Sequence, residues 1–101
     1  MGSISFALEA LCEHPDWDGH ETVVSWHDLV SHTRAFIAIH NTNLGPATGG
    51  TRYSQYRSDE EALRDALKLS RAMTYKCALA RVPYGGGKGV IVANSHNPKK
   101  K

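Results

Sequence analysis

The stretch "SDEEALRDALKLSRAMTYKCALARVPYGGGKGVIV", residues 58–92, determines how the rest of the chain can fold. Its first part carries apolar residues at helical spacing, which predicts a long amphipathic helix. Ser58, followed three residues later by Glu61, has the pattern of a capping box and marks the start of this helix. We expect the helix to end near Leu79, stopped by Pro83 and the glycines beyond it.

The second part of the stretch places three glycines, Gly85 to Gly87, directly before Lys88. We interpret the glycines as a loop, and the β-branched run Val90 to Ala93 as a buried strand that follows it. A long helix before a strand can form a crossover between two parallel strands of one sheet.

The segments before residue 58 supply the other elements. Residues 22–28 and 34–42 are β-branched or aromatic and are joined by a short link, which predicts an antiparallel hairpin. We further expect a helix over residues 5–14 and a short strand over residues 51–55. The order predicts a single domain, residues 1–101, of α/β architecture, with a mixed, mostly parallel sheet flanked by helices.

Composition excludes several classes of protein. The formal net charge is only +2, and three of the lysines end the chain, so no basic stripe for nucleic acid is present. No apolar run approaches the ~20 residues of a membrane-spanning helix, and no membrane partner is expected. The six histidines match no metal-binding spacing. Cys12 and Cys77 lie far apart and are expected to be reduced thiols in a cytoplasmic protein.

The glycine–lysine segment lacks the pattern of a phosphate-binding loop. That pattern requires Gly and Ser or Thr at the positions held here by Val82 and Gly89, and the order of helix, loop and strand is also reversed. Lys88 and Lys76, which lies on an apolar helix face, can instead converge on one anion. One lysine would bind a carboxylate and the other, desolvated, would do acid–base work. A flexible turn at Lys88 and a solvated Lys76 remain the plainer alternatives.

Four segments together resemble a known family: "HPDWDGHETVV", "LGPATGGTRY", "DALKLSRAMTYKCALA" and "VPYGGGKGVIV". They resemble the N-terminal domain of the glutamate/leucine/phenylalanine/valine dehydrogenases, and are closest to the leucine and phenylalanine branch. The resemblance extends over nearly the whole chain, residues 5–93, with the motifs in the family's order.

The resemblance implies oxidative deamination of an L-amino acid to a 2-oxo acid and ammonia, with NAD or NADP as cofactor. It implies that Lys76 binds the substrate α-carboxylate and that Lys88, the catalytic lysine, helps to activate water. Gly49, Thr48 and Met73 are implied to lie at the substrate. Thr48 carries no charge for a second carboxylate, which favours an apolar amino acid over glutamate. Arg81 stands where the leucine branch is expected to have a small residue.

The family's catalytic aspartate and its cofactor-binding Rossmann domain have no counterpart in these 101 residues. We therefore expect the domain to be truncated at its C-terminal end, to bind no cofactor and to be inactive alone. Two hypotheses follow: a part of a longer amino-acid dehydrogenase, or a stand-alone interaction or ligand-binding module without catalytic activity. In both, we expect exposed apolar area to favour a homo-oligomer, a dimer or larger.

Overall fold

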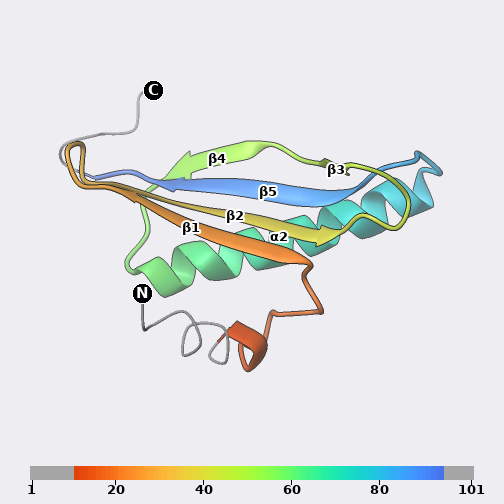
Figure 1. The fold of residues 1–101 in the computed structure, drawn as a ribbon, viewed down its shortest axis with the longest axis horizontal. Coiled ribbons are helices and arrows are strands. Elements are labelled where there is room, and N and C mark those ends of the chain that lie inside the picture. Colours follow the sequence, from red (N-terminus) through yellow and green to blue (C-terminus); the bar gives the residue numbers. More distant parts are fainter. Residues whose placement is uncertain (1–10, 95–101) are drawn as a thin grey trace.

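The computed structural model describes residues 11–94. One long helix and five strands follow each other along this part of the chain (Figure 1). In chain order they are β1 (Thr22–Asp28), β2 (Thr33–Asn41), β3 (Ala47–Thr48), β4 (Thr51–Ser54), α2 (Asp59–Leu79) and β5 (Gly85–Val92). The predicted helix over residues 5–14 falls mostly outside the described residues, which retain only its helical end at residues 11–12.

The strands form one mixed sheet in the order β1-β2-β5-β3, and β4 pairs with β5 beside β3. β1 and β2 form the predicted antiparallel hairpin, and β2 pairs antiparallel with β5. β3 and β4 run parallel to β5, as predicted for strands on either side of a helical crossover. The α/β class and the mixed sheet are confirmed. The parallel pairing is confined to the two short strands, because α2 is the only long crossover that the described residues contain.

α2 covers one face of the sheet, and the core lies between them (Figure 1). Ala62 and Ala66 have no exposed surface, and their short side chains let the helix approach the strands closely. The strands contribute the other buried apolar side chains of this layer. The core residues of helix and strands are Ala38, Ala62, Ala66, Leu67, Val90 and Val92.

None of the elements formed by residues 11–94 covers the opposite face of the sheet. Val24, Trp26 and Ile37 alternate with the inward-facing residues of β1 and β2, and they are 44%, 53% and 48% exposed. An apolar groove of about 280 Å³ runs along this face, between Trp26 and Ile91. A contiguous apolar surface of this kind marks a contact region rather than an ordinary solvent-facing sheet.

The helix begins as predicted, because the Ser58 hydroxyl accepts a hydrogen bond from the Glu61 amide at 3.2 Å. The helix also ends as predicted, at Leu79, with Ala80 as its C-cap. Pro83 and the glycines, expected to stop it, lie further along the chain, and the turn away from the helix is made at Arg81, whose φ of 57° is left-handed. The Val82 amide then bonds the Cys77 carbonyl at 3.1 Å, the arrangement of a Schellman C-cap.

The predicted glycine loop is wrong, because the glycines are the buried first half of strand β5. The expected strand at residues 90–93 thus begins five residues earlier, at Gly85. A Cβ on Gly85 would lie 1.6 Å from the Asn41 carbonyl oxygen, and one on Gly49 would lie 1.7 Å from the Gly87 carbonyl oxygen. Glycine is required here because neighbouring backbones approach too closely for any side chain.

The left-handed backbone at Arg81 generates a stability prediction. A residue with a Cβ in this conformation costs ~1–2 kcal/mol, and glycine removes that cost. We expect Arg81→Gly to raise the free energy of unfolding by about 1 kcal/mol in chemical denaturation. Arg81→Ala is the matched control, since it removes the charge and keeps the Cβ. An equal gain in both variants would show that the charge, and not the backbone, is responsible.

Candidate functional site

Three of the five predicted site residues gather where β3 meets β5. Thr48, Gly49 and Lys88 line one depression of about 260 Å³, together with parts of β2 and the start of β4. The close backbone contact between Gly49 and Gly87 forms its floor. Lys88 is half-buried at this place, as expected for a lysine in a partly dry site.

The Lys88 side chain starts from the sheet face that α2 covers. Lys88 is directly opposite Ala38, a core residue on that face, and alternates with the buried Val90. Its Nζ lies 3.6 Å from the point that a Cβ on Gly50 would occupy. The amine therefore lies beside the bend at Gly49 and Gly50, which carries no side chain that would displace it.

Lys76 and Met73 do not line this depression. Both belong to α2, Lys76 exposed and Met73 half-buried. Their spacing from Asp65 places them on the same flank of the helix as that residue. Asp65 accepts a hydrogen bond from Arg52 of β4 at 2.9 Å, so this flank lies over the β3–β4 edge of the sheet. Lys76 therefore lies on the helix flank over that edge, and Lys88 lies on β5, the strand that pairs with both β3 and β4.

A polar cluster fixes β4 to this flank of α2. The Asp65 carboxylate accepts hydrogen bonds from the Tyr56 hydroxyl at 2.6 Å and from Arg52 at 2.9 Å. Burial, together with the hydrogen bond to Asp65, raises the pKa of Tyr56 to about 12. The tyrosine therefore stays protonated at neutral pH and holds the strand that follows Gly50 in place.

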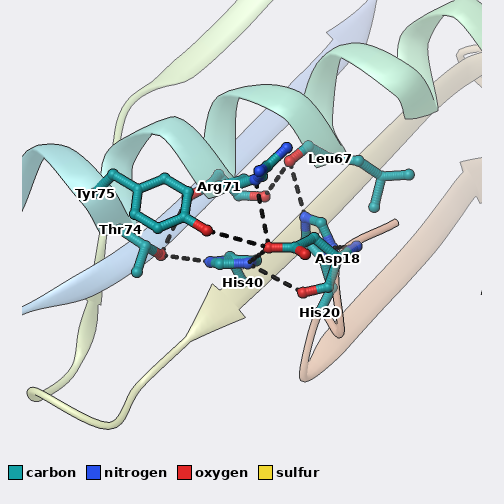
Figure 2. A network of polar contacts seen from close by, with 8 residues as sticks. Asp18, His20, His40, Leu67, Arg71, Thr74 and Tyr75 are labelled. Carbon is teal, nitrogen blue, oxygen red and sulfur yellow. Dashed lines mark hydrogen bonds and ion pairs between the residues drawn. The ribbon is translucent and has the colours of Figure 1, made fainter. Parts of the chain in front are cut away.

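A second polar network, which the sequence analysis did not identify, joins the segment before β1 to α2 and β2 (Figure 2). His40 is 5% exposed and stands at its centre, at a point where the register between β2 and β5 shifts. Its Nε2 lies 2.9 Å from Asp18 Oδ2, and its Nδ1 lies 2.8 Å from Thr74 Oγ1. Arg71 Nε also contacts Asp18 Oδ2, at 3.3 Å.

His20 belongs to the same network and is held as the neutral ring. Its Nδ1 accepts from the Asp18 amide at 3.1 Å, so its Nε2 donates to the Leu67 carbonyl at 2.8 Å. Burial lowers the pKa of His20. The hydrogen bond from His40, helped by the Arg71 guanidinium, lowers the pKa of Asp18. Close to neutral pH the network therefore contains a carboxylate and an uncharged imidazole.

One sequence feature points to this network in retrospect. His40 follows Ala38 by two residues in a strand, so it shares the face that α2 covers. A polar ring on a buried face must find hydrogen-bond partners. Residues 11–94 contain no group of three His, Cys, Asp or Glu side chains arranged to hold a metal ion.

The glycines of β5 do not form a phosphate cradle. The Gly85 amide donates to Pro46 and the Gly89 amide donates to Gly50, and the strand pairs with neighbours on both sides. These amides are therefore engaged in the sheet rather than directed at a ligand. Within the described part of the chain, no helix is both long enough and apolar enough to cross a membrane.

Most of the described chain is similar to proteins of one known family. Residues 20–101 match the family model described as Glu/Leu/Phe/Val dehydrogenase, dimerisation domain. The chain is 56% identical over 79 residues to L-tryptophan dehydrogenase of Nostoc punctiforme, covering 78% of this chain and 22% of that protein. It is 51% identical over 86 residues to valine dehydrogenase of Streptomyces virginiae, and this match covers 85% of this chain and 24% of that protein. It thus spans about a quarter of the length of these relatives.

Solved structures show the same fold. The crystal structure of L-tryptophan dehydrogenase from Nostoc punctiforme aligns with a TM-score of 0.74 and 46% identity, over 95% of this chain and 27% of that one. The hetero-hexameric glutamate dehydrogenase of Thermus thermophilus aligns with a TM-score of 0.64 at 22% identity, over 97% of this chain and 27% of that one. The second likeness concerns the fold alone.

The neutral His20 generates a pH prediction. An unfolded histidine gains a proton below about pH 6.5, whereas the folded chain resists this because burial lowers the pKa of His20. The free energy of unfolding should therefore fall from pH 7 towards pH 5. His20→Gln, which keeps a donor for Leu67 and does not titrate, should weaken that dependence in denaturation curves. The control His27→Gln, at an exposed position of β1, should not, and an unchanged slope in His20→Gln would contradict the assignment.

Proposed function

The chain belongs to the Glu/Leu/Phe/Val dehydrogenase family, and on that premise we propose that it is the substrate-binding and oligomerisation part of an L-amino-acid dehydrogenase. The reaction is the oxidative deamination of an apolar amino acid to a 2-oxo acid and ammonia, with NAD or NADP as oxidant. One observation supports the proposal: Lys88 lines the same depression as Thr48 and Gly49, while helical spacing puts Lys76 on the flank of α2 that carries Asp65, the partner of Arg52 on β4.

Lys76 and Lys88 have different surroundings, which supports different roles. Lys76 is exposed on the helix flank, so its ammonium group is free to bind the substrate α-carboxylate as a charge-assisted hydrogen bond. Lys88 is half-buried on β5, where it exchanges a proton with the reacting centre and helps to activate water. Gly49 lets the chain after β3 pass directly against the Gly87 carbonyl of β5, and it thereby holds the wall of the depression at which the amino acid binds in this proposal.

Thr48 and Met73 contact the substrate side chain in this proposal. Thr48 lines the depression and carries no charge, so nothing at that position would pair with a second carboxylate. Relatives named for tryptophan, valine and phenylalanine support an apolar or aromatic substrate. We place leucine in the same class, and the side-chain pocket formed with Met73 selects among these amino acids.

The cofactor must come to the site from outside the described residues. Residues 11–94 contain no dinucleotide fingerprint, because their consecutive glycines lie in a paired strand that follows a helix. NAD or NADP supplies the hydride acceptor when a second domain binds it. This chain's own residues hold the substrate and move a proton, and the 101-residue chain alone is inactive.

A stand-alone module that binds an amino acid or a partner without turnover is the second candidate. The measurement that separates the two is the mass of the native gene product, detected in cell extract with an antibody against this domain. A product several times heavier than this chain supports the dehydrogenase. A product of 11.1 kDa would leave ligand binding and association as its functions.

We further propose that the protein is cytoplasmic and forms a homo-oligomer, a dimer or larger. Both cysteines are free thiols, which suits a reducing compartment. The uncovered sheet face with Trp26 and Ile37 is the surface through which two copies associate, and its groove has the apolar lining of an interface core. Membranes and nucleic acids are not partners in this proposal.

The carboxylate role of Lys76 is tested by amino-acid binding. We expect Lys76→Met to weaken the binding of L-phenylalanine or L-valine about tenfold or more, because a charge-assisted hydrogen bond is lost. Calorimetry or NMR titration of the chain measures this, with Lys68→Met on an exposed part of α2 as the matched control. In the whole enzyme, Lys88→Met should lower kcat by at least about a hundredfold. Equal binding by Lys76→Met and the unaltered chain would refute the assignment.

The oligomer is tested at Trp26. Light scattering at micromolar concentration should give at least twice the mass of one chain, and Trp26→Lys should reduce it, because a charge enters the centre of the apolar face. Leu79→Lys is the control: this side chain is 86% exposed at the end of α2, away from the open sheet face. A monomer before any substitution, or an equal effect of both variants, would exclude this interface.

A further inference from the structure

Thr74 lies where the two lysine-bearing segments touch. On α2 it precedes Lys76 by two residues, within the same helical turn. Across the layer it packs on Gly86, which precedes Lys88 by two residues on β5. A Cβ on Gly86 would lie 2.5 Å from Thr74 Oγ1 and 2.4 Å from the Thr74 amide nitrogen. A small movement of Thr74 must therefore displace the Gly86 backbone. Lys76 and Lys88 each lie two residues from this contact, one on α2 and one on β5.

The Thr74 hydroxyl has two possible acceptors for its one hydrogen. Its oxygen lies 2.8 Å from His40 Nδ1 and 3.3 Å from the Ser70 carbonyl oxygen. The carbonyl can only accept, whereas Nδ1 either accepts or, when it carries a proton, donates. The state of Nδ1 therefore decides whether the hydroxyl points towards the ring or towards Ser70.

Nε2, the other ring nitrogen of His40, cannot switch between donor and acceptor as Nδ1 can. Nε2 lies 2.9 Å from Asp18 Oδ2 and 3.2 Å from the Asp18 carbonyl oxygen, and both of these atoms accept hydrogen bonds. Asp18 is an acceptor here because its pKa is lowered, first of all by this hydrogen bond. Nε2 thus keeps its hydrogen in both states of the ring, and gain or loss of a proton takes place at Nδ1.

Both states satisfy every polar atom of this chain of contacts. With Nδ1 bare, the Thr74 hydroxyl donates to it; with Nδ1 protonated, the ring donates to Thr74, which donates to Ser70. At a site as buried as His40, a single unsatisfied group would cost about 1–3 kcal/mol, so this complete pairing permits a reversible exchange.

We propose that His40 is a positioning residue for Lys76 and Lys88. Its protonation state, transmitted by the Thr74 hydroxyl, sets how the α2 turn rests on Gly86. The consequence for catalysis rests on the proposed roles of the two lysines, whereas the coupling itself does not. The titratable or charged groups that face His40 from the surrounding elements are Asp18, His20, Glu21, Arg71 and Tyr75.

These neighbours all have partners of their own. Asp18 Oδ2, which lies 2.9 Å from His40 Nε2, is also paired with Arg71 Nε at 3.3 Å. His20 is held neutral by its two backbone partners. The centroids of the His20 and His40 rings lie 4.7 Å apart. The Glu21 carboxylate accepts from the Thr42 amide and hydroxyl. The Tyr75 hydroxyl donates to Asp18 Oδ2 at 3.5 Å.

The experiment is an NMR titration of the full 101-residue chain from about pH 5 to about pH 8, the range in which histidine changes charge. It follows the His40 ring and the backbone amides of Lys76 and Gly86. We expect the two amides to shift with the midpoint of the His40 ring. Thr74→Val should abolish the response at both amides while His40 still titrates, and Thr74→Ser should retain it. The control Thr22→Val, at an exposed threonine of β1, should change nothing.

The unaltered chain alone can overturn the proposal, so the test does not require that Thr74→Val folds. Amides that stay fixed while His40 titrates would exclude the coupling, as would a His40 ring that does not titrate in this range. A response that persists in Thr74→Val would show a field effect through space rather than transmission by the hydroxyl. No amino acid is present in this titration, so its result is separate from the Lys76→Met binding result.

Discussion

The contact between the backbone of β5 and the middle of α2 is the constraint on which the other features depend. A Cβ on Gly86 would lie 2.1 Å from the Ser70 carbonyl oxygen, so helix and strand meet with no side chain between them. Alanines at 62 and 66 continue this close approach along the helix. Because helices keep their side-chain directions fixed, this contact also determines which flank of α2 lies over the β3–β4 edge. Lys76 on that flank and Lys88 on β5 are arranged by packing, and not by a flexible loop.

Two polar clusters fix the helix from its two sides. On one side Asp65 binds Arg52 and Tyr56, which holds β4 and the bend before it. On the other side the Asp18–His40 pair joins the segment before β1 to Thr74. Buried polar groups that are fully paired restrict a fold to one arrangement more than apolar packing does. The helix therefore cannot slide along the sheet without breaking hydrogen bonds at one flank or the other.

Much of this arrangement could be predicted from the sequence, and the reasons differ by element. The hairpin and α2 were predictable because β-branched runs and the Ser58 cap act locally. Gly85 to Gly87 were misassigned because their low strand propensity was outweighed by close backbone approach, which only the assembled sheet reveals. Thr48, Gly49 and Lys88 do line one depression. Strand periodicity predicts that His40 faces the core, but it cannot identify Asp18, 22 residues away, as the partner of the ring.

The glycine run also limits how this protein can change during evolution. Positions 85 and 86 on β5, and position 49 beside it, accept no larger residue, because an added Cβ would collide with neighbouring backbone atoms. Lys88 follows these glycines on β5 and is half-buried, whereas Thr48 is exposed on β3 and Met73 is half-buried on α2. Sequence changes near the depression are therefore easier to accept at Met73 on α2 and at Thr48 on β3 than at the glycines. A library of variants that tests the proposed amino-acid preference should accordingly randomise the positions around Thr48 and Met73 and leave the glycines of β5 unchanged.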